Sequence, residues 1–152
     1  MEKKRILVID DDEIVRENFK VILELEGYNI DTAETGKEAI EKSNANFYNL
    51  ALIDIRLPDL EGTQLLTTMH DTVPKMVKII VTGYPSLENA KDAVNMGADG
   101  YIVKPIVDKD EFLKKIKEHL KKQEEAQRYS EHKVAEYIET RARQEEAKET
   151  RT

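Results

Sequence analysis

The stretch ILVIDDDEIV, residues 6–15, decides the fold of this chain. Four apolar residues lead directly into three aspartates and a glutamate, and an apolar rhythm resumes after them. Like charges about 4 Å apart near a protein surface repel by roughly 4 kcal/mol per pair. A strand that ends in such a cluster of carboxylates therefore needs something nearby that offsets their repulsion.

Short apolar runs alternate with helical patterns along the rest of the chain. The apolar run at the start of the stretch has the length of a buried parallel strand. The same reading predicts five strands, at residues 6–9, 28–32, 50–53, 77–81 and 101–103. It also predicts five helices, at residues 13–26, 36–43, 62–69, 87–96 and from 108 through 120. In the first helix, five apolar residues have the spacing of one buried face: Ile14, Val15, Phe19, Ile22 and Leu25.

Five strands that alternate with five helices predict an α/β fold, in which a parallel sheet is covered by helices on both faces. In open sheets of this kind, ligands bind beyond the carboxyl ends of the strands. Six polar residues follow the predicted strands directly, and we expect them at one rim: Asp10, Asp11, Asp12, Asp54, Thr82 and Lys104.

This set of side chains has the chemistry of a phosphoryl-transfer site. Carboxylates that converge on one point, with no soft donor nearby, favour a hard divalent cation such as Mg²⁺. Thr82 and Lys104 are suited to anionic oxygens on the other side of that cation. Asp54 stands alone at the end of its strand and could act as a nucleophile that forms an acyl phosphate.

Four blocks of the sequence resemble, in order and spacing, the signature blocks of the response-regulator receiver domain of two-component signalling. They are ILVIDDDE, LIDIRLPDLEG, IIVTGY and GADGYIVKP, and the resemblance covers residues 4–120. It implies a doubly wound, flavodoxin-like sheet with strand order 2-1-3-4-5. It also implies a receiver domain at residues 1–120, followed by a charged helical tail or linker at residues 121–152.

The resemblance implies a role for each residue at the rim. Asp54 matches the phosphoacceptor and also a metal ligand. Asp10 and Asp11 match the acidic pair that organises Mg²⁺, with Asp11 as the direct ligand. Arg56 matches the position whose backbone carbonyl binds the metal. Asp12 matches no required ligand, and we interpret it as the start of the first helix, where negative charge is favourable.

The remaining matches concern the switch. Thr82 matches the hydroxyl that bonds a phosphoryl oxygen, and Lys104 matches the lysine that pairs with the phosphoryl group. Its bond to Pro105 is cis in the family. Tyr101 matches the aromatic residue that turns inward when Thr82 is drawn to the phosphate.

These matches imply that the domain takes a phosphoryl group from a histidine kinase onto Asp54, using Mg²⁺. It would then switch the face formed by the fourth helix, fifth strand and fifth helix, and catalyse only its own phosphorylation and dephosphorylation. Arg56 and Tyr84 depart from the commonest patterns. We expect these bulky side chains to restrict attacking water and prolong the phosphorylated state.

Two alternatives stay open at this point. Aspartates two apart after a first strand also occur in haloacid-dehalogenase-like phosphohydrolases. However, Ile14 stands where a threonine or valine is expected, and the chain is short for the usual cap. The second alternative is a pseudo-receiver that serves only for docking, although all the required residues are present.

Composition narrows the class further. The net charge of -7 lies wholly in residues 1–120, because the tail has eight acidic and eight basic side chains. An acidic domain argues against direct nucleic-acid binding. The absence of cysteine excludes disulfides and thiolate chemistry. Without an apolar run long enough for a bilayer or a recognisable signal peptide, a cytoplasmic protein with no membrane contact is expected.

The tail from Lys121 has no glycine or proline, so the last helix is predicted to continue outward. Its predicted seam is polar at Gln123, Gln127 and Ser130, and apolar character returns only around Val134. The tail could be a frayed helix, a weak dimer-forming helix or a linker, and we favour the linker. The expected partners are a histidine kinase, a second copy bound through the switching face or the tail, and an effector domain beyond residue 152.

Overall fold

The computed structural model describes residues 2–150; residues 1, 151 and 152, including the end of the predicted tail, lie outside the described residues. Its five strands are β1 (Arg5–Ile9), β2 (Asn29–Ala33), β3 (Leu50–Asp54), β4 (Val77–Thr82) and β5 (Gly100–Val103). Its five helices are α1 (Glu13–Leu25), α2 (Gly36–Ala45), α3 (Gly62–Thr68), α4 (Leu87–Asn95) and α5 (Lys109–Thr150). The predicted alternation of elements is confirmed.

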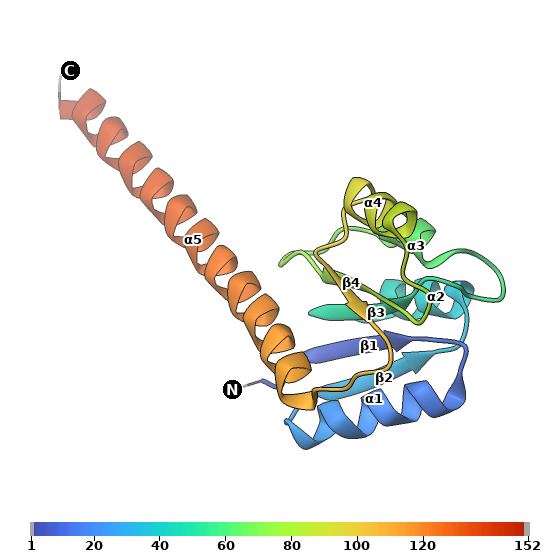
Figure 1. Cartoon of the computed structure of the whole chain (residues 1–152). Coiled ribbons are helices and arrows are strands. Elements are labelled where there is room, and N and C mark those ends of the chain that lie inside the picture. The colour runs from blue at the N-terminus through green and yellow to red at the C-terminus, as the bar shows by residue number, and fades with distance from the viewer. Residues whose placement is uncertain (1, 151–152) are drawn as a thin grey trace.

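The strands form one parallel sheet with the order β2-β1-β3-β4-β5, as expected from the resemblance. Alternate residues of each strand face opposite sides of the sheet, so each side has its own apolar core. Helices α1 and α5 cover one side, where Phe19 and Phe112 pack on Ile6 and Val8. Helices α2, α3 and α4 cover the other side, where Leu65 packs near Leu7. Figure 1 shows the three layers.

The predicted buried face of α1 is partly wrong. Phe19 and Leu23 are buried, but Ile14 and Leu25 are exposed. The third buried residue of this helix is Arg16, because its guanidinium finds polar partners at the end of β1. Val15 and Ile22 pack partly buried against the same core, so periodicity of apolar residues placed the buried face correctly except for Ile14 and Leu25.

The ends of α1 follow the expected chemistry. The Asp12 carboxylate accepts hydrogen bonds from the backbone N–H groups of Ile14 and Val15, at 2.9 and 3.3 Å, and so caps the helix. At the other end Gly27 adopts φ 95°, a conformation that residues other than glycine rarely adopt. The helix therefore begins immediately after the carboxylate cluster.

Helix α5 is continuous over 42 residues and extends far beyond the sheet, which confirms the predicted outward continuation (Figure 1). Phe112, Ile116 and Leu120 bury their side chains on the α1 side of the core. Past this point the helix is mostly exposed, with ion pairs one turn apart such as Arg128–Glu124. Within residues 2–150, no helix is both long enough and apolar enough to cross a membrane.

Gln123 anchors α5 to the amino-terminal edge of the sheet. Its Nε2 donates to the carbonyl oxygens of Asn49 and Lys75, at 2.8 and 2.7 Å. Its Oε1 accepts a hydrogen bond from Asn49 Nδ2 at 3.1 Å. The side chain is buried, although the sequence analysis had placed Gln123 on a polar seam of the tail.

We expect Gln123→Ala to lower the free energy of unfolding by about 2–3 kcal/mol, because it leaves buried amide and carbonyl groups unpaired. Gln127→Ala is the matched control one turn further on, where the side chain donates a hydrogen bond to exposed Glu131. It should change stability by less than about 0.5 kcal/mol. Urea unfolding followed by circular dichroism measures both, and equal effects would contradict the anchoring role.

Candidate functional site

The carboxyl ends of four neighbouring strands form the candidate site. Asp10 follows β1, Asp54 is the last residue of β3, Thr82 is the last of β4, and Lys104 follows β5. Because these strands are adjacent in the sheet, their ends lie side by side. The sequence had placed Asp54 and Thr82 just after their strands, and the structure extends both strands by one residue.

Three carboxylates converge at this rim. Oxygen atoms of Asp10, Asp11 and Asp54 all lie within 4.8 Å of one another. Asp10 and Asp54 are buried, whereas Asp11 is exposed. An all-oxygen donor set that is partly open to solvent fits a hard cation such as Mg²⁺ or Ca²⁺, which keeps some of its waters.

The Lys104 ammonium lies between two of these carboxylates. Its Nζ is 2.8 Å from Asp10 Oδ2 and 3.6 Å from Asp54 Oδ1. Burial works against the charged form, but the hydrogen bond to Asp10 and the charge of Asp54 outweigh it and raise the pKa of Lys104. The lysine is therefore a permanent cation that offsets part of the repulsion within the cluster.

Asp54 is held in an unfavourable environment for a charge. Burial and the nearby charge of Asp10 raise the pKa of Asp54 from its usual 3.8 to about 6. Lys104 and the backbone N–H of Arg56 oppose this shift without cancelling it. A cation bound at the cluster would favour the ionised form, which is the form that can attack an electrophile.

Asp10 is fixed by Asp12, the residue that caps α1, and by Arg16 within the helix. The backbone N–H of Asp12 donates to Asp10 Oδ1 at 2.9 Å, so one carboxylate oxygen is held by the turn and the other by Lys104. Arg16 Nη1 donates to the Asp10 carbonyl oxygen at 2.7 Å, and its Nη2 contacts Glu34 Oε1 at 3.0 Å. Arg16 was not among the residues predicted from the sequence, where its only signal is its i, i+3, i+7 spacing with Phe19 and Leu23.

The loop after β3 is equally constrained. A Cβ on Gly62 would lie 2.0 Å from the Asp54 carbonyl oxygen, so only glycine allows this close approach. Asp59 reaches the start of α2, where its two carboxylate oxygens accept the N–H groups of Gly36 and Lys37 at 2.9 Å each. These hydrogen bonds lower the pKa of Asp59. Asp59 was also missed, because a cap supplied by a distant loop leaves no local pattern.

Thr82 and Tyr101, the predicted switch pair, lie on the neighbouring strands β4 and β5. Thr82 is fully buried, and its Oγ1 accepts the backbone N–H of Tyr84 at 3.0 Å. The Tyr101 ring packs against the core on the α3–α4 side. Its hydroxyl oxygen is buried without a hydrogen-bond partner among residues 2–150, so the side chain is turned inward.

Two bulky side chains meet at the rim above the site. The Arg56 guanidinium lies over the Tyr84 ring, with its Cζ 4.7 Å from the ring centroid. Both side chains are exposed, and each follows the end of a strand that carries a site residue, Asp54 or Thr82. At this distance the two side chains form a cation–π pair.

A cavity of about 670 Å³ adjoins the site on the side of α1. Val15, Phe19 and Ile22 line it from the helix, and Tyr84 and Lys104 line it from the loops after β4 and β5. The apolar wall and the ammonium are thus next to each other. A partner that reaches Asp54 from this side would contact both.

Sequence comparison identifies the architecture. A model of the response regulator receiver domain matches residues 6–117. Over 112 residues the chain is 31% identical to the cell cycle response regulator CtrA of Brucella ovis. The match covers 74% of this chain and 48% of that protein, so the chain spans about half the length of such relatives.

Solved structures agree with this result. A CheY-like receiver domain protein from Methanospirillum hungatei JF-1 is 50% identical, with a TM-score of 0.77, and the match covers 82% of this chain and 99% of that one. A response regulator from Burkholderia pseudomallei, which contains a phosphorylated aspartic acid, a calcium ion and citrate, is 32% identical. Its TM-score is 0.68, and the match covers 73% of this chain and 65% of that one. This chain belongs to the response regulator receiver domain family.

Proposed function

We propose that this receiver domain accepts a phosphoryl group from a histidine kinase onto Asp54, with Mg²⁺ bound beside it. The observation that carries the proposal is the convergence of Asp10, Asp11 and Asp54 around one point, with the Lys104 ammonium between Asp10 and Asp54. The phosphorylated aspartic acid and calcium ion of the Burkholderia pseudomallei relative support the same chemistry here.

In the proposed reaction, an Asp54 carboxylate oxygen attacks the phosphorus of the phosphodonor. A new P–O bond forms as the P–N bond to the kinase histidine breaks, and the released imidazole takes a proton from solvent. Asp10, Asp11, Asp54 and the Arg56 backbone carbonyl would hold Mg²⁺. When bound, Mg²⁺ would neutralise charge on the transferring group.

Lys104 and Thr82 would bind the product. The Lys104 ammonium, now 3.6 Å from Asp54, would pair with a phosphoryl oxygen. The Thr82 hydroxyl accepts the Tyr84 N–H and has its own hydrogen left to donate to a second oxygen. Both contacts exist only in the phosphorylated state, so they supply the differential stabilisation that a switch requires.

We further propose that Thr82 and Tyr101 switch the face formed by α4, β5 and α5. Moving the equilibrium of this face from mostly inactive to mostly active requires about 5.5 kcal/mol of differential stabilisation. The buried, unpaired hydroxyl of Tyr101 makes the inward position costly by about 1–3 kcal/mol unless a contact compensates for it. Movement of Thr82 toward a phosphoryl group would favour that position. Exposed Leu87, Val94 and Val103 make this face suitable for contact with a second copy or another partner.

Domain organisation and location follow from the same proposal. We propose residues 1–120 as the receiver domain and residues 121–152 as a helical linker of the kind that would join it to an effector domain. The match of the receiver family to residues 6–117 and the greater length of the relatives support this division. The phosphodonor would be met in the cytoplasm, and no direct contact with nucleic acid or membrane is proposed.

Membership of the receiver family removes the reason to retain a phosphohydrolase as an alternative.

Incubation with acetyl phosphate and Mg²⁺ should add one phosphoryl group to the wild type and none to Asp54→Ala, as read by mass spectrometry of the intact protein. Asp12→Asn is the matched control, because asparagine preserves the helix cap and Asp12 is no proposed ligand. Addition to Asp54→Ala would contradict the assignment. Repeated turnover of a small phosphate monoester would favour a phosphohydrolase instead.

In the absence of metal, Asp54→Asn should be more stable than the wild type at about pH 7.5, by roughly 1–3 kcal/mol. The folded pKa of Asp54, about 6, lies above its usual 3.8, so the folded state binds more protons between these values. Wild-type stability therefore falls as the pH rises through this range, and the advantage of the variant should shrink at about pH 5. Thermal unfolding in EDTA measures the difference.

Asp59→Asn provides a control of opposite sign, because hydrogen bonds lower the pKa of Asp59 in the folded state. This variant should lose stability relative to the wild type above the unfolded pKa, and the loss should diminish toward acid pH. Added Mg²⁺ should then stabilise the wild type more than Asp54→Asn, since it binds the folded site. Equal stabilisation of both proteins would count against Asp54 as a ligand.

The Arg56–Tyr84 pair should slow loss of the phosphoryl group. Because the two side chains stack on each other, Arg56→Asn and Tyr84→Ala should each accelerate dephosphorylation several-fold, and the double variant should be little faster than either one. Tyr129→Ala removes the ring of another cation–π pair, with Lys133 on the tail, and should leave the rate unchanged. An unchanged rate in the Arg56→Asn, Tyr84→Ala double variant would refute the shielding role.

A further inference from the structure

One face of α5 carries no charge from the domain to well beyond it. Its residues recur at intervals of three or four and therefore share a side of the helix: Phe112, Ile116, Leu120, Gln123, Gln127, Ser130, Val134 and Tyr137. Ile138, four residues after Val134, widens this side. The first four are buried against the domain, whereas Val134, Tyr137 and Ile138 are exposed. We call this set the uncharged stripe. Its outer half is an apolar surface that nothing in residues 2–150 covers.

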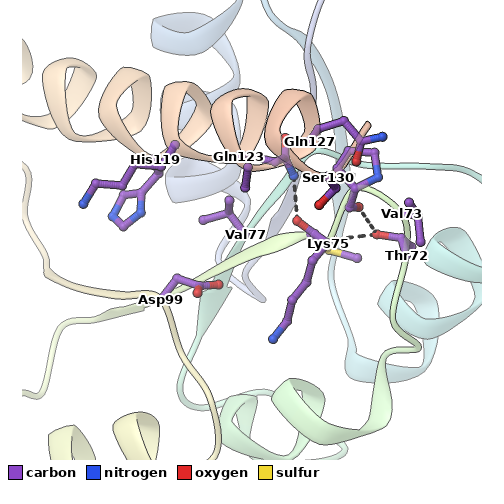
Figure 2. A pocket seen from close by; sticks show the side chains of 13 residues that line it. Thr72, Val73, Lys75, Val77, Asp99, His119, Gln123, Gln127 and Ser130 are labelled. Carbon is purple, nitrogen blue, oxygen red and sulfur yellow. Dashed lines mark hydrogen bonds between the residues drawn. The ribbon is translucent and has the colours of Figure 1, made fainter. Parts of the chain in front are cut away.

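A groove lies beside the stripe where α5 leaves the domain. The cavity measures about 550 Å³ and lies between α5 and the loop that leads into β4 (Figure 2). Gln127 and Ser130 of the stripe line one wall. Lys122 and Asp99 also line the groove, whereas the Lys75 ammonium points away from α5 (Figure 2). Lys122 is therefore the cation that the groove offers to a segment running along α5.

The position of the domain limits how two α5 helices can pair. The uncharged stripe faces the side of α5 on which the domain lies, as its buried half shows. Two parallel helices joined by their stripes would place both domains in the same space. Two antiparallel helices place the domains at opposite ends of the pair, so the domains are kept apart.

Charges at the ends of the exposed stripe match in the same antiparallel arrangement. Arg141 and Lys148 continue the line of the stripe toward the carboxyl end, and neither forms an ion pair within residues 2–150. Glu131 and Glu124 border the stripe toward the domain. If a two-fold axis passes near residue 136, Glu131 lies opposite Arg141 of the second copy, and Glu124 opposite Lys148. In a parallel pair, each cation would instead face its own equivalent.

We propose that a second copy of this chain binds the uncharged stripe, with the two α5 helices antiparallel and crossing near residue 136. Val134 of one copy then packs on Ile138 of the other. The acidic carboxyl-terminal part of each helix, with Glu145 and Glu146, lies against the groove of the other copy, opposite Gln127 and Ala126. Its negative side chains meet Lys122 there.

The extent of the contact fits a dimer of modest affinity. Standard protein interfaces bury about 1,600 Å² in total, more than three exposed apolar side chains per copy can supply. Contacts of both helix ends with both grooves add to the apolar centre. An isologous pair also repeats every contact twice, so a single substitution acts at two places.

Sedimentation equilibrium of the full chain, without phosphodonor, tests the proposal. We expect a concentration-dependent dimer that Ile138→Glu abolishes. Arg141→Glu and Glu131→Arg should each raise the dissociation constant about ten-fold, since each creates two like-charge contacts. The double variant Glu131→Arg, Arg141→Glu should recover wild-type affinity. Arg143→Glu is the control, because Arg143 lies on the other side of the helix and pairs with Glu139 of its own chain.

Circular dichroism of every variant confirms that α5 is intact. A monomer at all concentrations, or a dimer that Ile138→Glu leaves unchanged, would overturn the proposal. Failure of the double variant to recover affinity would overturn the antiparallel arrangement. A wild-type chain that binds only an effector segment supplied in trans would assign the stripe to that partner instead.

Discussion

The structure depends on the position of the Lys104 ammonium between Asp10 and Asp54. Parallel strands bring three carboxylates to one rim of the sheet, and their mutual repulsion has to be offset. A single cation from the loop after β5 does this and ties that loop to the ends of β1 and β3. The strand order makes the contact possible, because it places β3 between β1 and β4 and β5 beside β4.

Lys104 offsets only part of the repulsion among the three carboxylates, and the repulsion that remains suits the site to binding a cation. Asp54 stays difficult to ionise, with a pKa of about 6. The folded domain is therefore stabilised when a divalent cation binds, or when the aspartyl group is neutralised, because either change reduces the charge repulsion. Tyr101 carries a second local cost in its buried, unpaired hydroxyl. Local losses of stability of this kind concentrate at functional sites, where residues do not all favour the folded state.

The elements, their order and the convergence of the strand-end residues were predictable from sequence. Apolar periodicity identifies strands and helices, and the geometry of parallel sheets then brings Asp10, Asp54 and Lys104 to one rim. Long-range polar contacts were not predictable in this way. Arg16 is buried because it meets the Asp10 carbonyl, Asp59 caps a helix from another loop, and Gln123 bonds the sheet edge. Asp59 and Gln123 leave no periodic signal, and Arg16 shares the spacing of Phe19 and Leu23 but is a polar residue among apolar ones.

The continuity of α5 has a mechanical consequence. No glycine or proline interrupts the helix between its anchor at Gln123 and Thr150, a span of about 40 Å at 1.5 Å per residue. Such a rod behaves as a lever whose fulcrum is the amide cluster at the base of β3 and β4. A tilt of about 5° at that fulcrum would displace the far tip by roughly 3–4 Å, a distance comparable to a side-chain contact. Small rearrangements inside the sheet would therefore change the position of the far end of α5.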